Sequence, residues 1–226
     1  HVNSMAIAVK HFLDKYPMAE MHEGDAYITN DPWLTCGHLH DLTVVTPVFK
    51  DGRPVGSFAS TAHVVDIGGR GFGPDGRAVF EEGLYIPIMP LVRAGVINAD
   101  LMEMVRWNVR EPLQVEGDIL SLISCNQEGA RRLLDMMAEF SLETLDNLAE
   151  DILTRSRDAA LAGIRKLPAG TYHNRLTMDG YDEPIELLAA MTISEDGVHV
   201  DFTGSSSVSN YGINVVLNYT IAYTSF

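Results

Sequence analysis

Two apolar runs on either side of a tight-turn signal constrain the fold of this chain more than any other feature. Residues 42–49 read "LTVVTPVF" and residues 54–65 read "PVGSFASTAHVV", with "DGR" between them. Runs rich in β-branched residues favour strands, and Asp-Gly favours the turn of a two-residue hairpin. The pattern therefore predicts an antiparallel hairpin in which Leu42 and Val65, or residues close to them, face each other.

This hairpin gathers side chains that can bind metals. His38 and Asp41 precede its first strand with the spacing His-x-x-Asp, and His63 and Asp66 repeat that spacing at the end of its second strand. Although His38 and His63 are far apart in the sequence, a ribbon folded back at residue 52 would place them a few ångströms apart. We therefore expect these residues to form one cluster.

Two imidazoles and one carboxylate form a ligand set that suits zinc, manganese or ferrous iron. Three protein ligands leave positions open for water or substrate, which is the pattern of catalytic metal sites. The sequence thus predicts a metal site of His38, Asp41 and His63, with Asp66 orienting a histidine ring from outside the ligand set. The alternative is that these residues only cap turns and bind backbone amides.

Three neighbouring residues are interpreted more plainly. Cys36 offers a thiolate ligand or nucleophile, but a cysteine beside a glycine turn is more typical of an ordinary small residue. Trp33, which follows Pro32, is more typical of packing than of stacking on a substrate. His40 alternates with His38 in a run that we expect to be extended, so it should point the other way and lie outside the site.

A glycine-rich loop follows the hairpin. Residues 66–87 read "DIGGRGFGPDGRAVFEEGLYIP", with six glycines and two prolines and no clear period. Long loops in compact domains tend to be functional or mobile. The loop lacks the Gly-Lys-Ser/Thr arrangement that binds phosphate. Arg70 and Arg77 could reach an anionic substrate, Arg70 being the weak candidate for substrate binding, but a solvated loop charge is the commoner role.

Helix and strand signals divide the remaining chain. We expect an N-terminal helix capped by Asn3 or Ser4, a strand over 25–30, and a helix capped by Asn98. Further helical patterns run over 113–124, 127–140 and 142–167, where Ser141 and Thr144 are candidate caps. After residue 168, short alternating runs between turn signals predict an antiparallel β-meander.

The predicted fold class is α+β, with a hairpin-centred mixed α/β metal-binding region, a helical middle and a terminal β-meander. We expect these to form three parts: a metal-binding catalytic region over 1–112, a helical segment over 113–168, and a β-rich region over 169–226 that starts a further domain. The chain begins without methionine and ends on "NYTIAYTSF". We therefore expect it to be a fragment of a larger subunit.

Composition excludes several classes of partner. The 226 residues carry a formal net charge of −15 and are 46% hydrophobic, so a sizeable core is possible. Nucleic acid and anionic membrane surfaces repel such a chain. No apolar run reaches membrane-spanning length, and no signal peptide is visible. The two cysteines do not form a disulfide framework, which favours the cytoplasm.

Five ordered blocks of the sequence resemble the hydantoinase B/oxoprolinase family. These are "HVNSMAIAV", "GDAYITNDPW", "GHLHDLTVVTPVF", "STAHVVDIGGRGFGPDGR" and "FEEGLYIPIM". The resemblance covers most of the chain and is densest from His1 to about residue 90. The family includes B subunits of ATP-dependent N-methylhydantoinase and 5-oxoprolinase, and subunits of acetone and acetophenone carboxylases are similar to it.

The resemblance implies a division of labour between subunits. An A-type partner uses ATP to phosphorylate the amide or enol oxygen, and the B subunit carries the metal centre. The family's metal ligands correspond to His38, Asp41 and His63 here. A further carboxylate ligand of the family lies upstream of "HVNSM", outside this chain, and Asp31 is the fallback fourth ligand. His40 and Cys36 depart from the family's common pattern, which bears on substrate choice.

We therefore predict the B subunit of an ATP-dependent cyclic amide hydrolase, working in a hetero-oligomer with a hydantoinase A-type ATP-binding subunit. The cofactor is expected to be a divalent metal, zinc or manganese first and iron as the alternative, while ATP is used by the partner. One rival is a subunit of an ATP-dependent ketone carboxylase of the acetone or acetophenone type. The other is a non-catalytic scaffold that only positions the A subunit.

Overall fold

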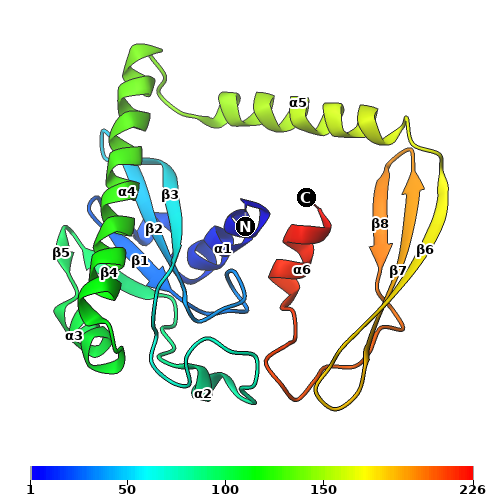
Figure 1. Ribbon diagram of the computed structural model, residues 1–226. Helices are drawn as coiled ribbons and strands as arrows, with labels where there is room; N and C mark the ends of the chain where they lie inside the picture. Colours follow the sequence, from blue (N-terminus) through cyan, green and yellow to red (C-terminus); the bar gives the residue numbers. More distant parts are fainter. Residues whose placement is uncertain (1, 226) are drawn as a thin grey trace. The chain divides into compact units, whose positions relative to one another are not determined.

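A computed structural model describes residues 2–225 and confirms the α+β class. Its eight strands form two antiparallel sheets, of five strands in the order β3-β2-β1-β4-β5 and of three in the order β6-β7-β8 (Figure 1). The strands are β1 Ala26–Thr29, β2 Asp41–Lys50, β3 Arg53–His63, β4 Met89–Arg93, β5 Val96–Ile97, β6 Gly170–Met178, β7 Ile185–Ser194 and β8 Gly197–Asp201. The helices are α1 Val2–Lys15, a short 3-10 helix Met18–Glu20, α2 Val79–Glu82, α3 Ala99–Asn108, α4 Pro112–Glu139, α5 Asp146–Ile164 and α6 Leu217–Thr224.

The chain divides into two compact units, 1–144 with 211–226 and 145–210. These units cut the chain at other places than the three expected regions, because the last residues return to the first unit and the helical stretch is shared between the two. Within residues 2–225, no helix has the length and apolar character needed to cross a bilayer.

The predicted hairpin is confirmed. Asp51 and Gly52 both have positive φ, 51° and 73°, which is the backbone of the tight turn that Asp-Gly favours. Leu42 pairs with Ala62, three positions from the expected Val65, because β3 ends at His63. One step further along the ladder, Asp41 pairs with His63.

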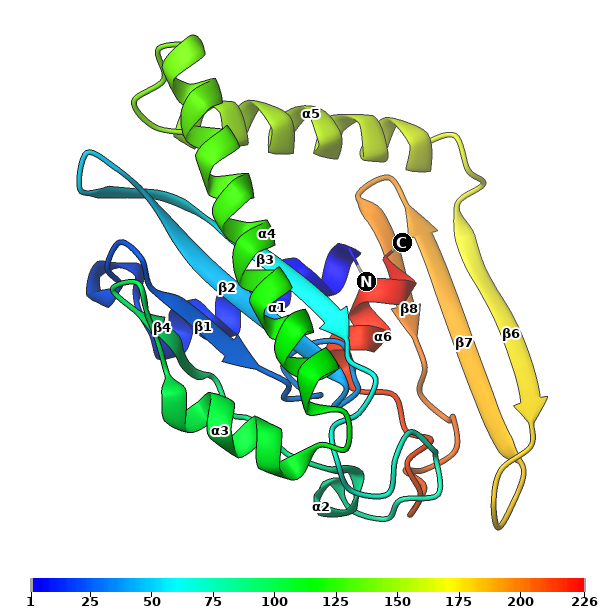
Figure 2. The same cartoon turned by 60° about the vertical axis from the view of Figure 1, so that its left-hand side comes forward.

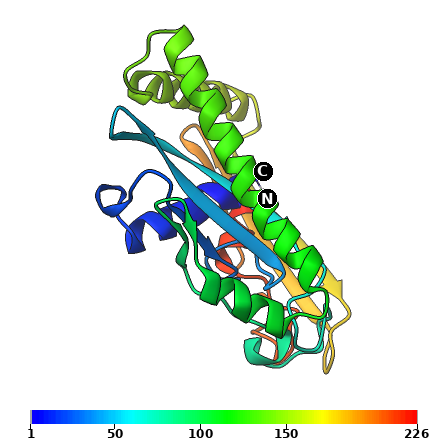
Figure 3. The same ribbon diagram turned by 90° about the vertical axis from the view of Figure 1, so that its left-hand side faces the viewer.

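Helices cover both faces of the five-stranded sheet. Residues alternate across a strand, so Ile28 of β1 faces a core shared with Ile119 of α4, whereas Tyr27 packs with Phe12 of α1 on the opposite face. Figure 3 shows α1 and α4 on opposite sides of these strands. The hairpin is thus held between two packed layers, which fixes the position of its ends.

Three helix predictions are wrong, and each for a local reason. Asn3 and Ser4 lie inside α1, and the amide of Asn3 donates instead to the Ala222 carbonyl of α6 at 3.2 Å. The patterns over 113–124 and 127–140 form one helix, α4, because the buried Asn126 donates its amide to the Val44 carbonyl, at 3.1 Å, rather than breaking the helix.

Helix α5 begins after Leu145, which makes no side-chain capping bond, so neither Ser141 nor Thr144 is its cap. By contrast, the predicted cap of α3 is confirmed, since Asn98 Oδ1 accepts from the Leu101 amide at 3.1 Å.

The second unit contains the predicted β-meander. Helix α5 leads into β6, β7 and β8, which lie side by side in Figure 2 and pair antiparallel in sequence order. Tight turns connect them, as the alternating pattern predicted.

Candidate metal centre

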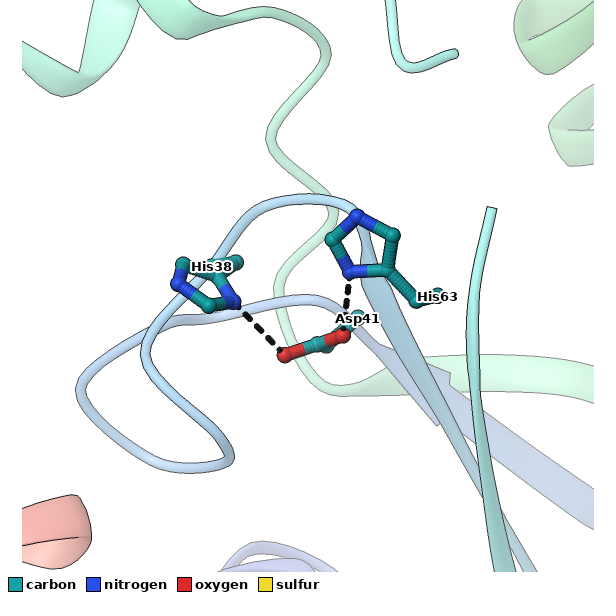
Figure 4. A group of neighbouring side chains, drawn as sticks. All are labelled: His38, Asp41 and His63. Atoms are coloured by element: carbon teal, nitrogen blue, oxygen red, sulfur yellow. Dashed lines mark hydrogen bonds and ion pairs between the residues drawn. The ribbon is translucent and has the colours of Figure 1, made fainter. Parts of the chain in front are cut away.

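The end of the hairpin holds three side chains that converge (Figure 4). Nδ1 of His63 lies 2.8 Å from Oδ1 of Asp41, and Nδ1 of His38 lies 3.2 Å from Oδ2 of the same carboxylate. Among residues 2–225, this is the one group of at least three His, Cys, Asp or Glu side chains whose ligand atoms all lie within 4.8 Å of one another. The structure therefore brings together the three residues that the sequence singled out.

The backbone explains this convergence. Asp41 and His63 are direct partners in the ladder, so their side chains emerge on the same side of the sheet. The chain before β2 turns, with the Asp41 amide donating to the His38 carbonyl at 3.2 Å, and this turn swings His38 back over the strand end. Register alone places one histidine, and the turn places the other.

A buried asparagine fixes that turn. Asn30, at the end of β1, donates its amide to the carbonyls of Leu39 at 2.7 Å and Leu84 at 2.9 Å, and its Oδ1 accepts from the Ile86 amide at 2.7 Å. It thereby ties the His38 turn to the glycine-rich loop. The sequence interpretation missed this role, since an asparagine at a strand end gives no signal beyond an ordinary turn.

Electrostatics keep the central carboxylate ionised. Burial pushes the pKa of Asp41 up, but the hydrogen bonds to His38 and His63 outweigh it and hold the pKa below its usual value. The hydrogen bond to Asp41 raises the pKa of His38 against the opposing effect of burial. Both imidazoles remain accessible, with 45% and 47% of the side chains of His38 and His63 exposed.

This donor set fits a divalent cation. Ligands 2.0–2.2 Å from a tetrahedral ion stand about 3.3 Å apart, and the two nitrogen–oxygen separations at Asp41 lie close to that value. The groups are neutral imidazoles and an ionised carboxylate, the types that zinc, manganese and iron accept. Three ligands from the protein leave room for further ones on the exposed side.

His40 lies beside the cluster and not away from it, so the expectation that it points elsewhere is wrong. Residues 38–40 form a turn instead of an extended run, and the His40 carbonyl accepts from the Val64 amide at 2.8 Å. Its ring stacks on His63 with centroids 5.3 Å apart and an angle of 15°. Burial lowers the pKa of His40, and the positive charge of His63 lowers it further.

The other predicted site residues are engaged elsewhere. Asp31 Oδ1 accepts from the Trp33 amide at 2.9 Å, and its Oδ2 accepts from the Tyr85 hydroxyl. Both Asp66 oxygens accept from Arg110, each at 2.5 Å, so Asp66 does not hold a histidine ring.

The loop arginine and the cysteine are also accounted for. Arg70 pairs with Asp75 at 2.6 Å and with Glu81 at 3.0 Å. Cys36 is buried near the Ser4 hydroxyl, and burial raises the pKa of its thiol, which makes it an inert small residue in this environment.

Two further groups near the cluster had not been singled out. Phe72 of the glycine-rich loop contacts the rings of His38, His40 and His63. Glu82 of α2 is partly buried, which raises its pKa, while the charge of His38 acts in the opposite direction. The signal for Phe72 was present in the sequence, as an aromatic residue between two glycines, but its direction could not be read there.

An α+β protein with a candidate divalent-metal centre at a hairpin end is the class that fold and site define. The family model of hydantoinase B/oxoprolinase matches residues 1–226. The chain therefore belongs to the hydantoinase B/oxoprolinase family.

Solved and curated relatives agree with this assignment. The crystal structure of an ATP-dependent caprolactamase from Pseudomonas jessenii superimposes with a TM-score of 0.91 at 25% identity, covering 98% of this chain and 39% of that one. An acetone carboxylase in its nucleotide-free form shares the fold, with a TM-score of 0.84 at 21% identity over 98% of this chain and 32% of its own. A 5-oxoprolinase of Pestalotiopsis fici is 27% identical over 99% of this chain and 19% of its length.

This chain is shorter than these proteins. It spans 36% and 41% of the length of the two curated relatives that are 30% identical to it. Activities of whole proteins therefore reach this chain only as proposals.

Proposed function

We propose that this chain is the metal-binding part of the B subunit of an ATP-dependent cyclic amide hydrolase. The observation that carries the proposal is the convergence of two imidazoles on one ionised carboxylate, His38 and His63 on Asp41, at an accessible hairpin end. The likeness to an enzyme named as an ATP-dependent caprolactamase, over 98% of the chain, supports it.

Cyclic amides resist water because the nitrogen donates electrons into the carbonyl group. We propose that an A-type partner transfers a phosphoryl group from ATP to the amide oxygen, which makes the ring carbon electrophilic. Water then adds to that carbon, the ring C–N bond breaks, and the amine leaves with a proton. The net reaction consumes ATP and water and yields ADP, phosphate and the open amino acid.

The residues of this chain hold and orient the reacting groups. His38, Asp41 and His63 would bind the cation, and the low pKa of Asp41 keeps its carboxylate ready to do so at neutral pH. A bound divalent cation would lower the pKa of water and polarise the oxygen of the substrate. Asn30 keeps the His38 turn in place, and the layers under the hairpin keep His63 in register.

The test uses the complete assembly of the longer subunit with its ATP-binding partner. His38→Ala and Asp41→Ala should each reduce ring opening by at least about a hundredfold and lower the metal content measured by elemental analysis. His22→Ala is a matched control, because His22 and Asp25 have the same His-x-x-Asp spacing but join no third ligand. Full metal content and full turnover in the His38 and Asp41 variants would remove them from the site.

The same assay separates the rival functions. With ATP and bicarbonate, a ketone carboxylase would form a new C–C bond from a ketone and leave hydantoins and lactams intact, as the fold shared with acetone carboxylase permits. A scaffold subunit would bind no metal and would leave the complex fully active without it. Ring-opened product from a lactam, with metal present, supports the hydrolase.

A further inference from the structure

Phe72 is an aromatic side chain that lies against all three histidines of the candidate centre. Its ring centroid lies 5.3 Å from His38, 5.2 Å from His40 and 5.1 Å from His63, at interplanar angles of 81°, 82° and 90°. Edge-to-face arrangements at this distance are favourable contacts. Because 68% of Phe72 is exposed, much of the ring surface is still free to touch a further molecule.

The glycine-rich loop holds Phe72 in this place. Arg110 donates to the Gly68 carbonyl at 3.3 Å, and the Arg70 amide donates to the Glu81 carbonyl at 2.9 Å. Gly68 has φ of 83°, and a Cβ there would lie 2.3 Å from the Asn108 carbonyl oxygen, so only glycine allows this approach. The loop is therefore anchored just before Phe72.

The charged groups of the same loop are largely committed. Arg70 is paired with two carboxylates and Arg110 with Asp66, while the Arg77 guanidinium lies over the Tyr211 ring, 4.9 Å from its centroid. An anionic substituent placed beside Phe72 would lose its hydration and gain no cation from Arg70 or Arg110 in return. A methylene group placed there would gain apolar contact.

From this arrangement we propose that Phe72 is a specificity-determining residue that forms the apolar wall of the substrate site. It contacts the carbon part of an uncharged cyclic amide and positions the ring so that its carbonyl group faces His38, Asp41 and His63. The preferred substrates are neutral lactams or hydantoins with apolar carbon next to the reacting amide, and rings that carry a carboxylate there are disfavoured. This inference rests on the proposed function.

The first experiment compares two substrates that differ only in charge. The complete assembly is given 2-pyrrolidinone, an unsubstituted lactam, or 5-oxoproline, the same ring with a carboxylate. Wild type should prefer 2-pyrrolidinone by about tenfold or more in kcat/KM, and Phe72→Ala should lower that value about tenfold while changing 5-oxoproline little. Phe72→Leu keeps the apolar bulk and should retain most of the preference.

Phe80 provides the matched control for this comparison. It lies in the same loop region, on α2, and is 85% exposed. Phe80→Ala should leave both kcat/KM values unchanged. Elemental analysis should give the same metal content for wild type, Phe72→Ala and Phe80→Ala, which separates loss of the wall from loss of the metal.

A second experiment needs no turnover. Phe72→Trp is made in a background with Trp33→Phe and Trp107→Phe, and its fluorescence is followed while Co²⁺ is added. A Trp beside the ligands should be quenched in step with occupation of one site per chain. Phe80→Trp in the same background should be quenched much less.

The outcomes separate the two proposals. An active wild type that prefers 5-oxoproline, equal losses on both substrates in Phe72→Ala, or quenching of Phe72→Trp no stronger than that of Phe80→Trp would overturn the role of Phe72 alone. A wild-type assembly that contains metal and opens no cyclic amide would remove the proposed function, and this inference with it.

Discussion

The two compact units of this chain contrast sharply in how they are stabilised. In the first, helices pack on both faces of the five-stranded sheet, and side chains such as Phe12, Ile28 and Ile119 are fully buried. In the second, residues 145–210, all of which the structure describes, include Ile193 as the only buried residue. The candidate metal centre lies in the unit with the packed core.

The second unit nevertheless has the pattern of a one-sided sheet. Tyr172 pairs with Met191 and Leu176 with Leu187, so one face of the meander is apolar, while these side chains remain between 37% and 53% exposed. A ladder of hydrogen bonds forms there without a core beneath it. The contrast teaches that alternation predicts strands, whereas a precise site also needs packed layers that keep the strands in place.

The largest expected effect tests where the stability lies. Ile119→Ala removes a fully buried side chain between α4 and the sheet and should lower the free energy of unfolding by about 2–5 kcal/mol. Leu153→Ala, on α5 with 70% of the residue exposed, should change it by less than about 0.5 kcal/mol. Urea denaturation measures both, and equal effects would break the comparison between the units.

Helix capping should show a smaller difference of the same kind. Asn98→Ala deletes the acceptor for the Leu101 amide and should destabilise the protein by about 1 kcal/mol. Thr144→Ala, which precedes α5 and makes no capping bond there, should be neutral within about 0.5 kcal/mol. A cost at Thr144 as large as at Asn98 would show that α5 is capped after all.

The pair formed by His38 and Asp41 should give a pH-dependent contribution to the stability of the metal-free chain. The folded pKa of His38 is raised, so its contribution is present below about pH 6.5 and is lost as pH rises through the folded pKa. The folded pKa of Asp41 is depressed, so its contribution is present above about pH 3.9 and is lost as pH falls through the folded value. The contribution is therefore greatest between these limits.

Its size should be below about 1 kcal/mol, because the side chain of His38 is 45% exposed and water screens the pair. Urea midpoints measured from pH 4 to pH 8 should fall above pH 6.5 in wild type and flatten in Asp41→Asn. Added zinc should reverse the slope in wild type, since metal binding requires deprotonated ligands. An identical pH profile in wild type and Asp41→Asn would contradict the pairing.

The smallest effect is expected on the apolar face of the meander. Leu176 is 53% exposed, so Leu176→Thr, which keeps a good strand former, should change the free energy of unfolding of this chain by about 0.5 kcal/mol or less. Chemical denaturation of the chain measures this change. A loss comparable to that of Ile119→Ala would show that this face is covered and would end the contrast between the units.

The sequence by itself determined the elements with strong local signals. The Asp-Gly turn has positive φ at both positions, the Asn98 cap is in place, and the meander follows its alternation, because each of these depends on a few adjacent residues. The course of α4 through residue 126 did not follow from local signals, since the bond from Asn126 to Val44 joins positions distant in the chain.

The metal centre shows the same division. The spacing His-x-x-Asp occurs at His22, at His38 and at His63, and nothing in the spacing ranks the three. The sequence could select His38, Asp41 and His63 because a hairpin must bring its ends together. Only the tertiary structure decided that Asp66 binds Arg110 and that the His40 ring turns toward His63, since these depend on loops fixed by distant partners.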